Sequence, residues 1–541
     1  MANELKEASD SLHTALERYL DICSIHSRSL EGNTSCRIPR ELAGLIQEEF
    51  DSFKEYESRL GSAKLAITTA RNRTFHLSPV NTLPPEVLVH IFQIIFEGGP
   101  CDIDYLAQVC SRWRSVAFGS HYLWSHIDYH PNAHGHFCPQ LLDHARLHVT
   151  RSGRVPLEIH ISASIGRDDV DEDLHHKAKF FFQATAPRMW ALRVDLDLDE
   201  FAMFDNSADV YHHIISDLIS GSTPGMLTKL KTLDGTFDDF IIPENDSEAG
   251  VGDRGLMLST NRSELDQIFS SITVLQLQGL YPQWQSPTYH GLVDLRITPA
   301  YEGIKSLSEW ELIAILKSSP ELRILHFGYP ISNRIEGNTS NSRVTLSRLE
   351  ILQITSFQPG IPSHSFLKVH NILRLISPGS NPLHLSVRSH FVNQDEDIGD
   401  HSIEEIGTFL ARARVARLYT STHFLPEEFF IISSYLKVLI LDRYNHILSP
   451  LLPIDHGNES PSPPPAIEFC YMLYSSLDLE RFYSTVRRCS VQNLVIFKCR
   501  FYSNREEVSQ EQVVKGLLRI CPAVEFPSER PGMMAHRELF E

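Results

Sequence analysis

The sequence predicts an α plus α/β fold, with helices in the N-terminal part and a solenoid of alternating strands and helices after them. Two amphipathic helical patterns fill residues 1–76, and a compact helical module follows at 80–127. Short apolar strands then recur over 153–530, after a polar stretch at 128–152 that is expected to be a linker. A chain of 541 residues favours such a division, because single hydrophobic cores stop growing well below that length.

Composition and charge describe an ordinary globular protein. Apolar residues make up 42% of the chain, charged residues 22%, and the net charge is −19. Phosphate binding needs a basic face that releases counterions, so this balance argues against a nucleic-acid partner. No apolar run approaches the roughly 18 residues of a membrane span, and no export signal is expected. Nine cysteines without a CxxC pair favour reduced thiols in the cytoplasm or nucleus.

Two helices are expected in the N-terminal segment. The first covers about 3–22, where leucine and alanine recur on one face. The second covers about 40–72 and carries apolar residues at heptad a and d positions over 42–70, with Glu49 as the polar exception. The heptad residues are Leu42, Ile46, Phe53, Tyr56, Leu60, Ala63, Ile67 and Ala70. The pattern fits a helical hairpin folded on its own chain, or self-association through a coiled coil.

The stretch LPPEVLVHIFQIIF at 83–96 predicts a short apolar helix. Pro84 and Pro85 suit the first turn, where no backbone hydrogen bond is lost, and Glu86 favours the positive end of the helix. The Gly-Gly-Pro sequence at 98–100 is expected to end it. The helix is too short to cross a bilayer, and its apolar residues cover more than one face.

A second helical pattern follows in DIDYLAQVCSRWRSVAFGSHYLW. Apolar residues recur there at helical spacing, Asp102 or Asp104 is expected as N-cap, and a third apolar group stands at 122–124. A module of this size buries a low fraction of its surface and has more apolar side chains than short helices hide from one another. The excess apolar surface therefore predicts an outside partner.

Together these residues resemble an F-box. The family pattern is Leu-Pro-x-Glu, an Ile-Phe pair, Val-Cys-x-x-Trp, and a Leu-Trp after a short turn. The matching residues are Leu83, Pro84, Glu86, Ile91, Phe92, Val109, Cys110, Trp113, Leu123 and Trp124. The stretch between Phe92 and Val109 is slightly longer than in the compact motif, which would lengthen the loop between the helices. The Leu-Pro-Pro-Glu form after a heptad segment also resembles fungal F-box families.

The resemblance implies a substrate-receptor subunit of a Skp–cullin–F-box ubiquitin ligase. It implies docking on the Skp adaptor, and through it on a cullin, while the C-terminal region holds an unknown target protein. The residues expected to face or support the Skp surface are Leu83, Pro84, Glu86, Val87, Leu88, Ile91, Phe92, Leu106, Val109, Cys110 and Trp113. A role in the module's own core is the alternative for each. The rival function is a scaffold outside a ligase, which would act through the heptads and the C-terminal region.

From about residue 153 onward, segments of the form Leu-x-x-Leu-x-Leu recur, and each predicts one short strand. The clear examples are ITVLQL (272–277), LVDLRI (292–297), LRILHF (322–327), LEILQI (349–354), LKVLIL (436–441) and VQNLVI (491–496). Weaker relatives are MWALRV (189–194), PLHLSV (382–387) and VARLYT (415–420). Helical stretches separate them, such as the one expected to turn Trp310, Ile313 and Leu316 inward.

Helices that alternate with strands imply a parallel sheet. Strands of this form are typical of a leucine-rich-repeat solenoid, and their irregular spacing predicts a degenerate one. An ordinary doubly wound α/β domain is the alternative. The polar segments 242–266 and 449–465 are expected to be insertions.

Motifs for chemistry are sparse. His134, His136 and Cys138 alternate, and His144 and His148 stand at i, i+4. Imidazole and thiolate bind zinc, but no second cysteine pair completes a known spacing, so a polar connector is expected there and no metal or cofactor.

Acidic residues alternate at one strand end, where Asp195, Asp197 and Asp199 share a face. A solvated face is expected, and a docking surface for a basic partner is the alternative. No phosphate-binding loop, nucleophile elbow or zinc-protease motif occurs, so the chain is not expected to be an enzyme.

Overall fold

A computed structural model describes these residues of the 541-residue chain: 2–31, 40–73, 79–97, 103–130, 140–164, 172–197, 207–234, 239–241, 255–258, 260–299, 307–332, 343–355, 367–388, 400–421, 434–445, 466–504 and 506–528. The chain divides into two units, Met1–Ile94 and Ile95–Glu541. The first unit is helical, and a large parallel sheet dominates the second. The observed fold is therefore mixed α/β.

The first unit contains α1 (Ala2–Glu31), α2 (Arg40–Arg73), η1 (Pro79–Thr82) and most of α3 (Pro85–Glu97). α2 agrees with the predicted 40–72, but α1 runs nine residues beyond the predicted end at residue 22. The extension has a simple cause, because the first helix-breaking residue of the sequence is Gly32. α3 ends directly before the Gly-Gly-Pro sequence, as predicted.

Apolar side chains on α1 and α2 remain largely exposed. The two helices meet where the Tyr19 hydroxyl donates a hydrogen bond to Glu49 at 2.8 Å, and the Tyr19 ring lies 6.2 Å from that of Phe53. Glu49, the polar exception in the heptads, is thus a hydrogen-bond acceptor, and this bond raises the pKa of Tyr19 to about 12. The exposed heptad residues include Ile46, Phe53, Tyr56, Leu60 and Ile67.

The second unit begins with three short helices, α4 (Ile103–Val109), α5 (Ser111–Gly119) and η2 (His121–Trp124). The helical pattern breaks at Cys110, whose backbone is extended and whose Sγ accepts a hydrogen bond from the Trp113 amide at 3.4 Å. Cys110 is therefore the N-cap of α5. Asp104, expected as an N-cap, lies instead in the first turn of α4, and Asp102 lies outside the described residues.

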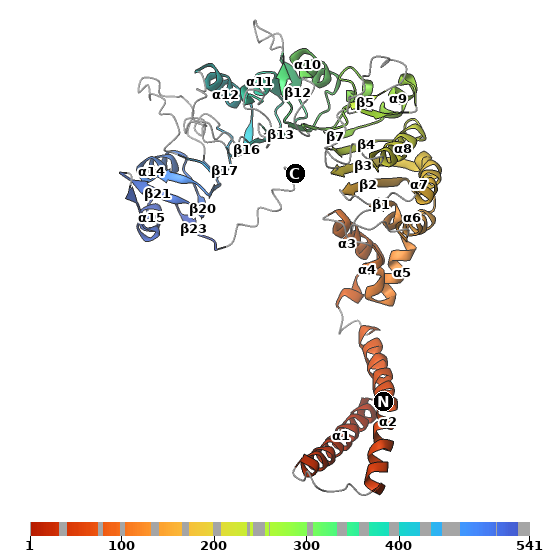
Figure 1. The fold of residues 1–541 in the computed structure, drawn as a ribbon. Coiled ribbons are helices and arrows are strands. Elements are labelled where there is room, and N and C mark those ends of the chain that lie inside the picture. The colour runs from red at the N-terminus through yellow and green to blue at the C-terminus, as the bar shows by residue number, and fades with distance from the viewer. Residues whose placement is uncertain are drawn as a thin grey trace. The chain divides into compact units, whose positions relative to one another are not determined.

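A fourteen-stranded sheet follows, and every neighbouring pair in it is parallel (Figure 1). Its strands are β1 (His126–Tyr129), β2 (Leu157–Ser164), β3 (Met189–Asp197), β4 (Lys229–Asp234), β7 (Val274–Gln278), β8 (Asp294–Thr298), β10 (Ile324–Phe327), β13 (Ile351–Thr355), β15 (Leu383–Arg388), β16 (Val415–Thr420), β17 (Val438–Asp442), β18 (Phe469–Leu473), β20 (Asn493–Phe497) and β23 (Ala523–Glu525). They lie in sequence order from one edge to the other. A doubly wound sheet reverses its strand order, and this sheet does not.

Helices lie along one face of this sheet (Figure 1). They are α6 (Gln140–Arg151), α7 (Glu172–Thr185), α8 (Ser207–Ser220), α9 (Arg262–Phe269), α10 (Glu309–Ser318), α11 (Val369–Leu373), α12 (Asp400–Arg412), α14 (Leu479–Arg488) and α15 (Gln510–Leu517), with the short turns η3 (Ala186–Arg188) and η5 (Pro287–Tyr289). The core fills the space between helices and sheet. Leu275, Leu295, Leu325 and Leu352 stand side by side there in neighbouring strands and are buried.

Four small sheets border the large one. They pair β5 (Asp239–Ile241) with β6 (Gly255–Met257), β9 (Leu307–Ser308) with β11 (Ile331–Ser332), β12 (Val344–Leu346) with β14 (Ile376–Pro378), and β21 (Arg500–Ser503) with both β19 (Ser476–Asp478) and β22 (Glu506–Glu507). β6 and the start of α9 fall in 242–266, which was expected to be an insertion, whereas 449–465 lies outside the described residues.

All nine predicted strand segments belong to the large sheet. Near the chain end, VVKGLLRICPAVEF shows the same pattern of a helix, a Cys-Pro break and an apolar strand, and its last part forms β23. Prediction missed β1, β2, β4 and β18. The stretch 128–152, expected as a linker, contains the end of β1 and all of α6, so the sheet begins at His126.

One predicted inward residue points outward. In α10, Leu312, Ile313 and Leu316 are buried, but Trp310 is exposed. Each residue turns a helix by about 100°, so Trp310 stands about 200° from Leu312 and misses the buried face. The same helix carries Glu309, which is buried and forms an ion pair with buried Arg374 at the end of α11.

Candidate partner-binding surfaces

The start of α3 is built as the prolines predict. The amides of Val87 and Leu88 both reach the Pro84 carbonyl, at 3.1 and 3.2 Å, so the first turn closes without a donor from either proline. Glu86 lies in this turn and is exposed. Val87 stays 41% exposed, whereas Leu88 is fully buried. α3 therefore presents one side to its surroundings and buries the other.

α4 and α5 present further apolar side chains. Val109 is 60% exposed and its neighbour Tyr105 is exposed as well, although both lie on a helix with a buried side. Arg114 of α5 donates from Nε to the Ala107 carbonyl at 2.9 Å, which fixes the corner between the two helices. Tyr105 was not among the predicted site residues, although the apolar excess of the module was a signal for it.

Trp124 forms the base of these helices. Its indole nitrogen donates to the Ala117 carbonyl at 2.8 Å, and its ring is fully buried. The Arg151 guanidinium of α6 lies 4.1 Å from the Trp124 ring centroid and 4.3 Å from that of Phe118. A cation between two aromatic rings is favourable, so this contact ties the short helices to the first helix of the sheet region.

The eleven predicted surface residues thus fall into three groups. Leu88, Phe92 and Leu106 are buried; Leu83, Ile91, Cys110 and Trp113 are half-buried; Pro84, Glu86, Val87 and Val109 are exposed. The exposed group is available to a partner without rearrangement, the half-buried group offers part of its surface, and the buried group belongs to cores. Sequence periodicity does not separate these roles, because both sides of the short helices are apolar.

A second surface lies on the sheet face opposite the helices. Strand registers align one residue of each strand into a central row: Asp128, His160, Arg193, Lys231, Gln276, Arg296, His326, Gln353, Ser386, Tyr419, Ile440, Tyr471, Val495 and Glu525. The row is charged and polar from Asp128 to Ser386, becomes aromatic and apolar from Tyr419 to Val495, and ends at Glu525. The face therefore offers two kinds of contact.

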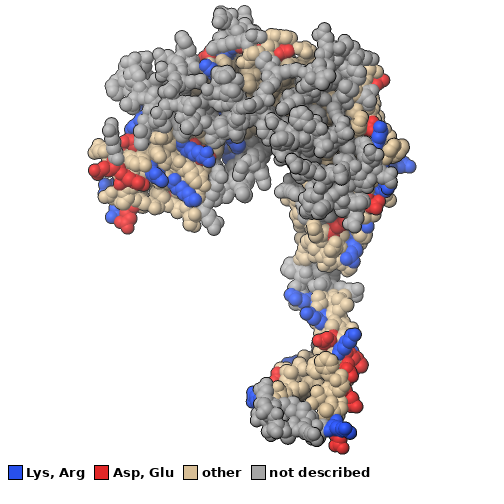
Figure 2. All heavy atoms as spheres, in the orientation of Figure 1, with Lys and Arg blue, Asp and Glu red and all other residues tan. Residues whose placement is uncertain are grey.

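The cationic part centres on Lys231. Burial lowers its pKa, and the nearby charges of Arg193 and Arg296 lower it further. His326, three strands beyond in β10, has its pKa lowered to about 3 by burial and by Arg296. Arg193 is paired with Asp195 and Arg296 with Asp294, so this part of the face carries charges of both signs. Elsewhere, Figure 2 shows basic and acidic side chains side by side on both the N-terminal helices and the sheet region.

The apolar part is a cluster separate from the main core. Ile440, Leu473 and Phe497 are buried together, and Tyr419, Val438 and Tyr471 pack against them. Phe469 and Tyr474 extend the same apolar character with exposed rings. We call these eight residues the apolar cluster.

The first strands carry a histidine and carboxylate network. Asp128 Oδ1 lies 3.2 Å from His126 Nε2 and 2.7 Å from His160 Nδ1, and His160 Nε2 lies 3.0 Å from Asp195 Oδ2. Burial alone would lower the pKa of His126, but hydrogen bonds to Asp128 and Glu158 outweigh it and raise the pKa to about 9. Asp195 was expected on a solvated face; its carboxylate is instead engaged by His160 and by Arg193.

Two of the histidines noted in the sequence have different hydrogen-bond partners. His144 Nε2 lies 2.8 Å from Asp104 Oδ2, and His148 Nδ1 lies 3.0 Å from the His126 carbonyl. His134, His136 and Cys138 lie outside the described residues.

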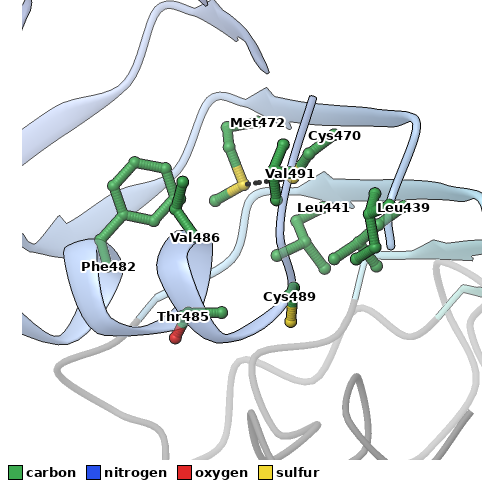
Figure 3. Close-up of a pocket in the computed structure, with 10 residues that line it drawn as sticks. Leu439, Leu441, Cys470, Met472, Phe482, Thr485, Val486, Cys489 and Val491 are labelled. Atoms are coloured by element: carbon green, nitrogen blue, oxygen red, sulfur yellow. Dashed lines mark hydrogen bonds between the residues drawn. The ribbon is translucent and has the colours of Figure 1, made fainter. Parts of the chain in front are cut away.

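A small cavity lies between α14 and the strands β17 and β18 (Figure 3). It is lined almost wholly by apolar and sulfur-containing side chains, among them Leu441, Cys470, Met472 and Phe482. Burial raises the pKa of the Cys470 thiol well above its usual range, so the thiol stays neutral. The hydroxyl of Thr485, which also lines the cavity, donates to the Arg481 carbonyl within its own helix, and the cavity is a packing gap of the core.

Comparison with known proteins addresses only the short helices. Residues 80–130 match the family model described as F-box-like. No curated protein matches the chain. Within the described residues, no helix combines the length and apolarity needed to cross a membrane.

Proposed function

We propose that this F-box protein is the substrate-receptor subunit of a Skp–cullin–F-box ubiquitin ligase. The single observation that carries the proposal is the F-box-like match at residues 80–130, since such domains typically bind Skp adaptors and serve ubiquitin ligases as adaptors. In this role the chain performs no chemistry. It raises the effective concentration of a target lysine near the ubiquitin carrier, in the cytoplasm or nucleus.

The proposed Skp-binding residues are the exposed ones among those predicted, namely Pro84, Glu86 and Val87 in the first unit and Val109 in the second. Leu83 and Ile91 of the first unit, and Cys110 and Trp113 of the second, are half-buried and contribute part of their surface, and the buried residues keep the helices in shape. Burying an apolar side chain stabilises a complex by roughly 1.5–3 kcal/mol, so two lost contacts reduce affinity by orders of magnitude.

Two variants test these residues, one double and one single. Pro84→Ala with Leu83→Ala, and Val87→Asp alone, should abolish or strongly reduce co-purification of the Skp adaptor. Phe469→Asp is the matched control, because Phe469 is also 41% exposed but lies on β18. Unchanged Skp recovery in the α3 variants, with the fold intact by circular dichroism, would contradict the assignment.

We further propose that the sheet region is a degenerate leucine-rich-repeat solenoid. The unreversed strand order and the aligned leucines support this. So does a short ladder after the strands: the Tyr444 amide donates to Ser475 Oγ at 3.0 Å, and the Ser475 amide to Cys499 Sγ at 3.5 Å. Cys499 stands where the repeat pattern places asparagine or cysteine.

The target is proposed to bind on the face opposite the helices, where the central row and the apolar cluster lie. Proximity labelling under a proteasome block, compared between wild type and Lys231→Glu or Phe469→Asp, tests this location. Each substitution should remove a shared set of labelled proteins while Skp is retained. Identical label sets would place the target elsewhere.

A second candidate is a scaffold that works without a cullin. The exposed heptad residues of α2 favour it, since they suit self-association. Recovery of Skp without a cullin from cells would support the scaffold, and recovery of both supports the ligase receptor.

A further inference from the structure

Three polar side chains from the first two sheet strands converge. His126 and Asp128 lie on β1, and His160 stands directly across from Asp128 on β2. One ring nitrogen from each histidine and one Asp128 oxygen lie within 4.8 Å of one another. Parallel strands hold their side chains in fixed register, so the pairing of β1 with β2 places the three side chains next to one another.

Their spacing suits a divalent transition-metal ion. Tetrahedral zinc holds nitrogen and oxygen ligands at about 2.0–2.1 Å, which places neighbouring ligand atoms about 3.3 Å apart. Asp128 Oδ1 lies 3.2 Å from His126 Nε2 and 2.7 Å from His160 Nδ1, close to that value. Imidazole favours zinc, copper, iron and nickel over calcium and magnesium.

The far ring nitrogen of each histidine lies beside a carboxylate, at hydrogen-bond distance in His160 and at ion-pair distance in His126. His160 Nε2 lies 3.0 Å from Asp195 Oδ2, and His126 Nδ1 lies 3.6 Å from Glu158 Oε2. A metal-bound histidine almost always donates its other N–H to such a group, which fixes the tautomer and the ring orientation. The arrangement therefore turns one nitrogen of each ring toward Asp128 as a lone-pair donor.

A third layer holds these carboxylates in place. Arg193 Nε donates to Asp195 Oδ2 at 2.8 Å, and Lys229 Nζ lies 3.4 Å from Glu158 Oε1. The network spans β1 to β4. Arg193 and Lys229 do not touch the ion but hold the carboxylates that orient the histidine rings.

We propose that His126, Asp128 and His160 bind one divalent transition-metal ion, with zinc as the expected occupant. Three protein ligands leave a fourth position for water or for a side chain of a partner. The ion would fasten the first two strands of the sheet and add a Lewis-acidic point to the face opposite the helices. This inference does not depend on the proposed ligase function.

Two other arrangements compete with it. In the first, His126 and His160 are both protonated. They then carry the same total charge as one divalent ion with two neutral rings, so protons alone can balance the carboxylates around them. Asp104, His144 and His148 form another group within 4.8 Å. There, however, Arg151 Nη1 lies 3.9 Å from Asp104 Oδ1 and competes with an ion for that carboxylate.

The first experiment is calorimetric titration of the chelator-treated full chain with zinc chloride. One saturable site is expected, at least tenfold weaker in Asp128→Asn and in His160→Gln. Asp195→Asn removes no ligand and should weaken binding about 10–100-fold. Asp128 is half exposed, so its variant tests the site even where His160→Gln disturbs folding. His144→Gln is the matched control and should bind zinc as wild type does.

Absence of saturable zinc binding would overturn the inference and leave protons as the occupant. Loss of binding in His144→Gln but not in Asp128→Asn would overturn it as well. Cobalt(II) adds a check of ligand type: the loaded chain should show visible absorption of a low-symmetry cobalt site that disappears in Asp128→Asn. A thiolate-to-cobalt band in its place would assign the ion to cysteine and refute the site.

Discussion

The N-terminal helices and the sheet region use the same apolar residues with opposite results. Leucine, isoleucine and phenylalanine recur periodically in both, yet those of α1 and α2 are exposed and those of the sheet strands are buried. In the sheet region every strand between the edge strands β1 and β23 has a strand on either side, and the helices along one face cover the apolar side chains of that face. The described part of α1 and α2 has no such stack. The periodicity of apolar residues thus predicts that a helix or strand forms. Whether its apolar side chains are buried depends on a neighbouring helix or strand that covers them.

The largest contrast is expected at an ion pair. Glu309 and Arg374 are 1% and 3% exposed, whereas Glu55 and Arg59 in α2 are 72% and 75% exposed. Glu309→Ala leaves a buried cation uncompensated and should destabilise the sheet region by about 3–5 kcal/mol. Glu55→Ala should change stability by less than about 0.5 kcal/mol. Urea unfolding followed by circular dichroism measures the stability of both variants. Similar unfolding midpoints would show that the buried ion pair contributes no more than the exposed one.

A leucine pair comes next. Leu295 in β8 is fully buried, and Leu65 in α2 is 68% exposed. Leu295→Ala should cost about 2–5 kcal/mol through lost transfer energy and a cavity. Leu65→Ala should stay within about 0.5 kcal/mol in dilute protein. A clear loss in Leu65→Ala at low concentration would mean that a neighbour already covers that residue.

The exposed heptad face of α2 should make self-association depend on protein concentration. Phe53→Lys with Leu60→Lys places charges on the heptad face of α2 and should weaken self-association at least tenfold, since each apolar side chain contributes about 1.5–3 kcal/mol when buried. Sedimentation of the full chain over a range of concentrations measures this, with Glu57→Lys as the surface control. A monomeric wild type at high concentration would instead assign the heptad face to a different protein.

The smallest effect is expected at Tyr19. Its pKa is raised to about 12 by the hydrogen bond to Glu49, which favours the neutral phenol in the folded state. The resulting stability is fully present below pH 10 and is lost as the pH rises toward 12. Tyr19→Phe should remove this pH dependence from the N-terminal helices. Spectroscopic titration of tyrosinate in wild type and variant checks it, and equal titration curves would show that the bond is not formed.

Sequence patterns predicted most of the sheet but only part of the candidate sites. The nine strands with leucine at fixed spacing were found because their burial is encoded locally. β1, β2 and β4 carry charged or histidine residues on one face, such as His160 and Lys231, and their alternation is short. The network of His126, His160 and Asp195 was missed, because its members come together only through strand register.

Within the short helices, the sequence did not separate exposed residues from buried ones. Val87 and Leu88 are adjacent and equally apolar, and only the packing shows that one is exposed and the other buried. Cys110 was expected as a surface residue in a continuous helix, and it caps a new one. Side-chain chemistry at these positions is shared between core and surface, so sequence alone does not separate them.

The unreversed order of the fourteen strands bears on how such a protein is made and how it diverges. Each strand bonds only to those adjacent in the series, so a newly synthesised strand finds its partner already exposed at the growing edge. For the same reason, duplication or loss of one strand-and-helix unit lengthens or shortens the series without rerouting the chain. The molecule can therefore acquire new binding specificities by changing its number of units, while its helical N-terminal part is left untouched.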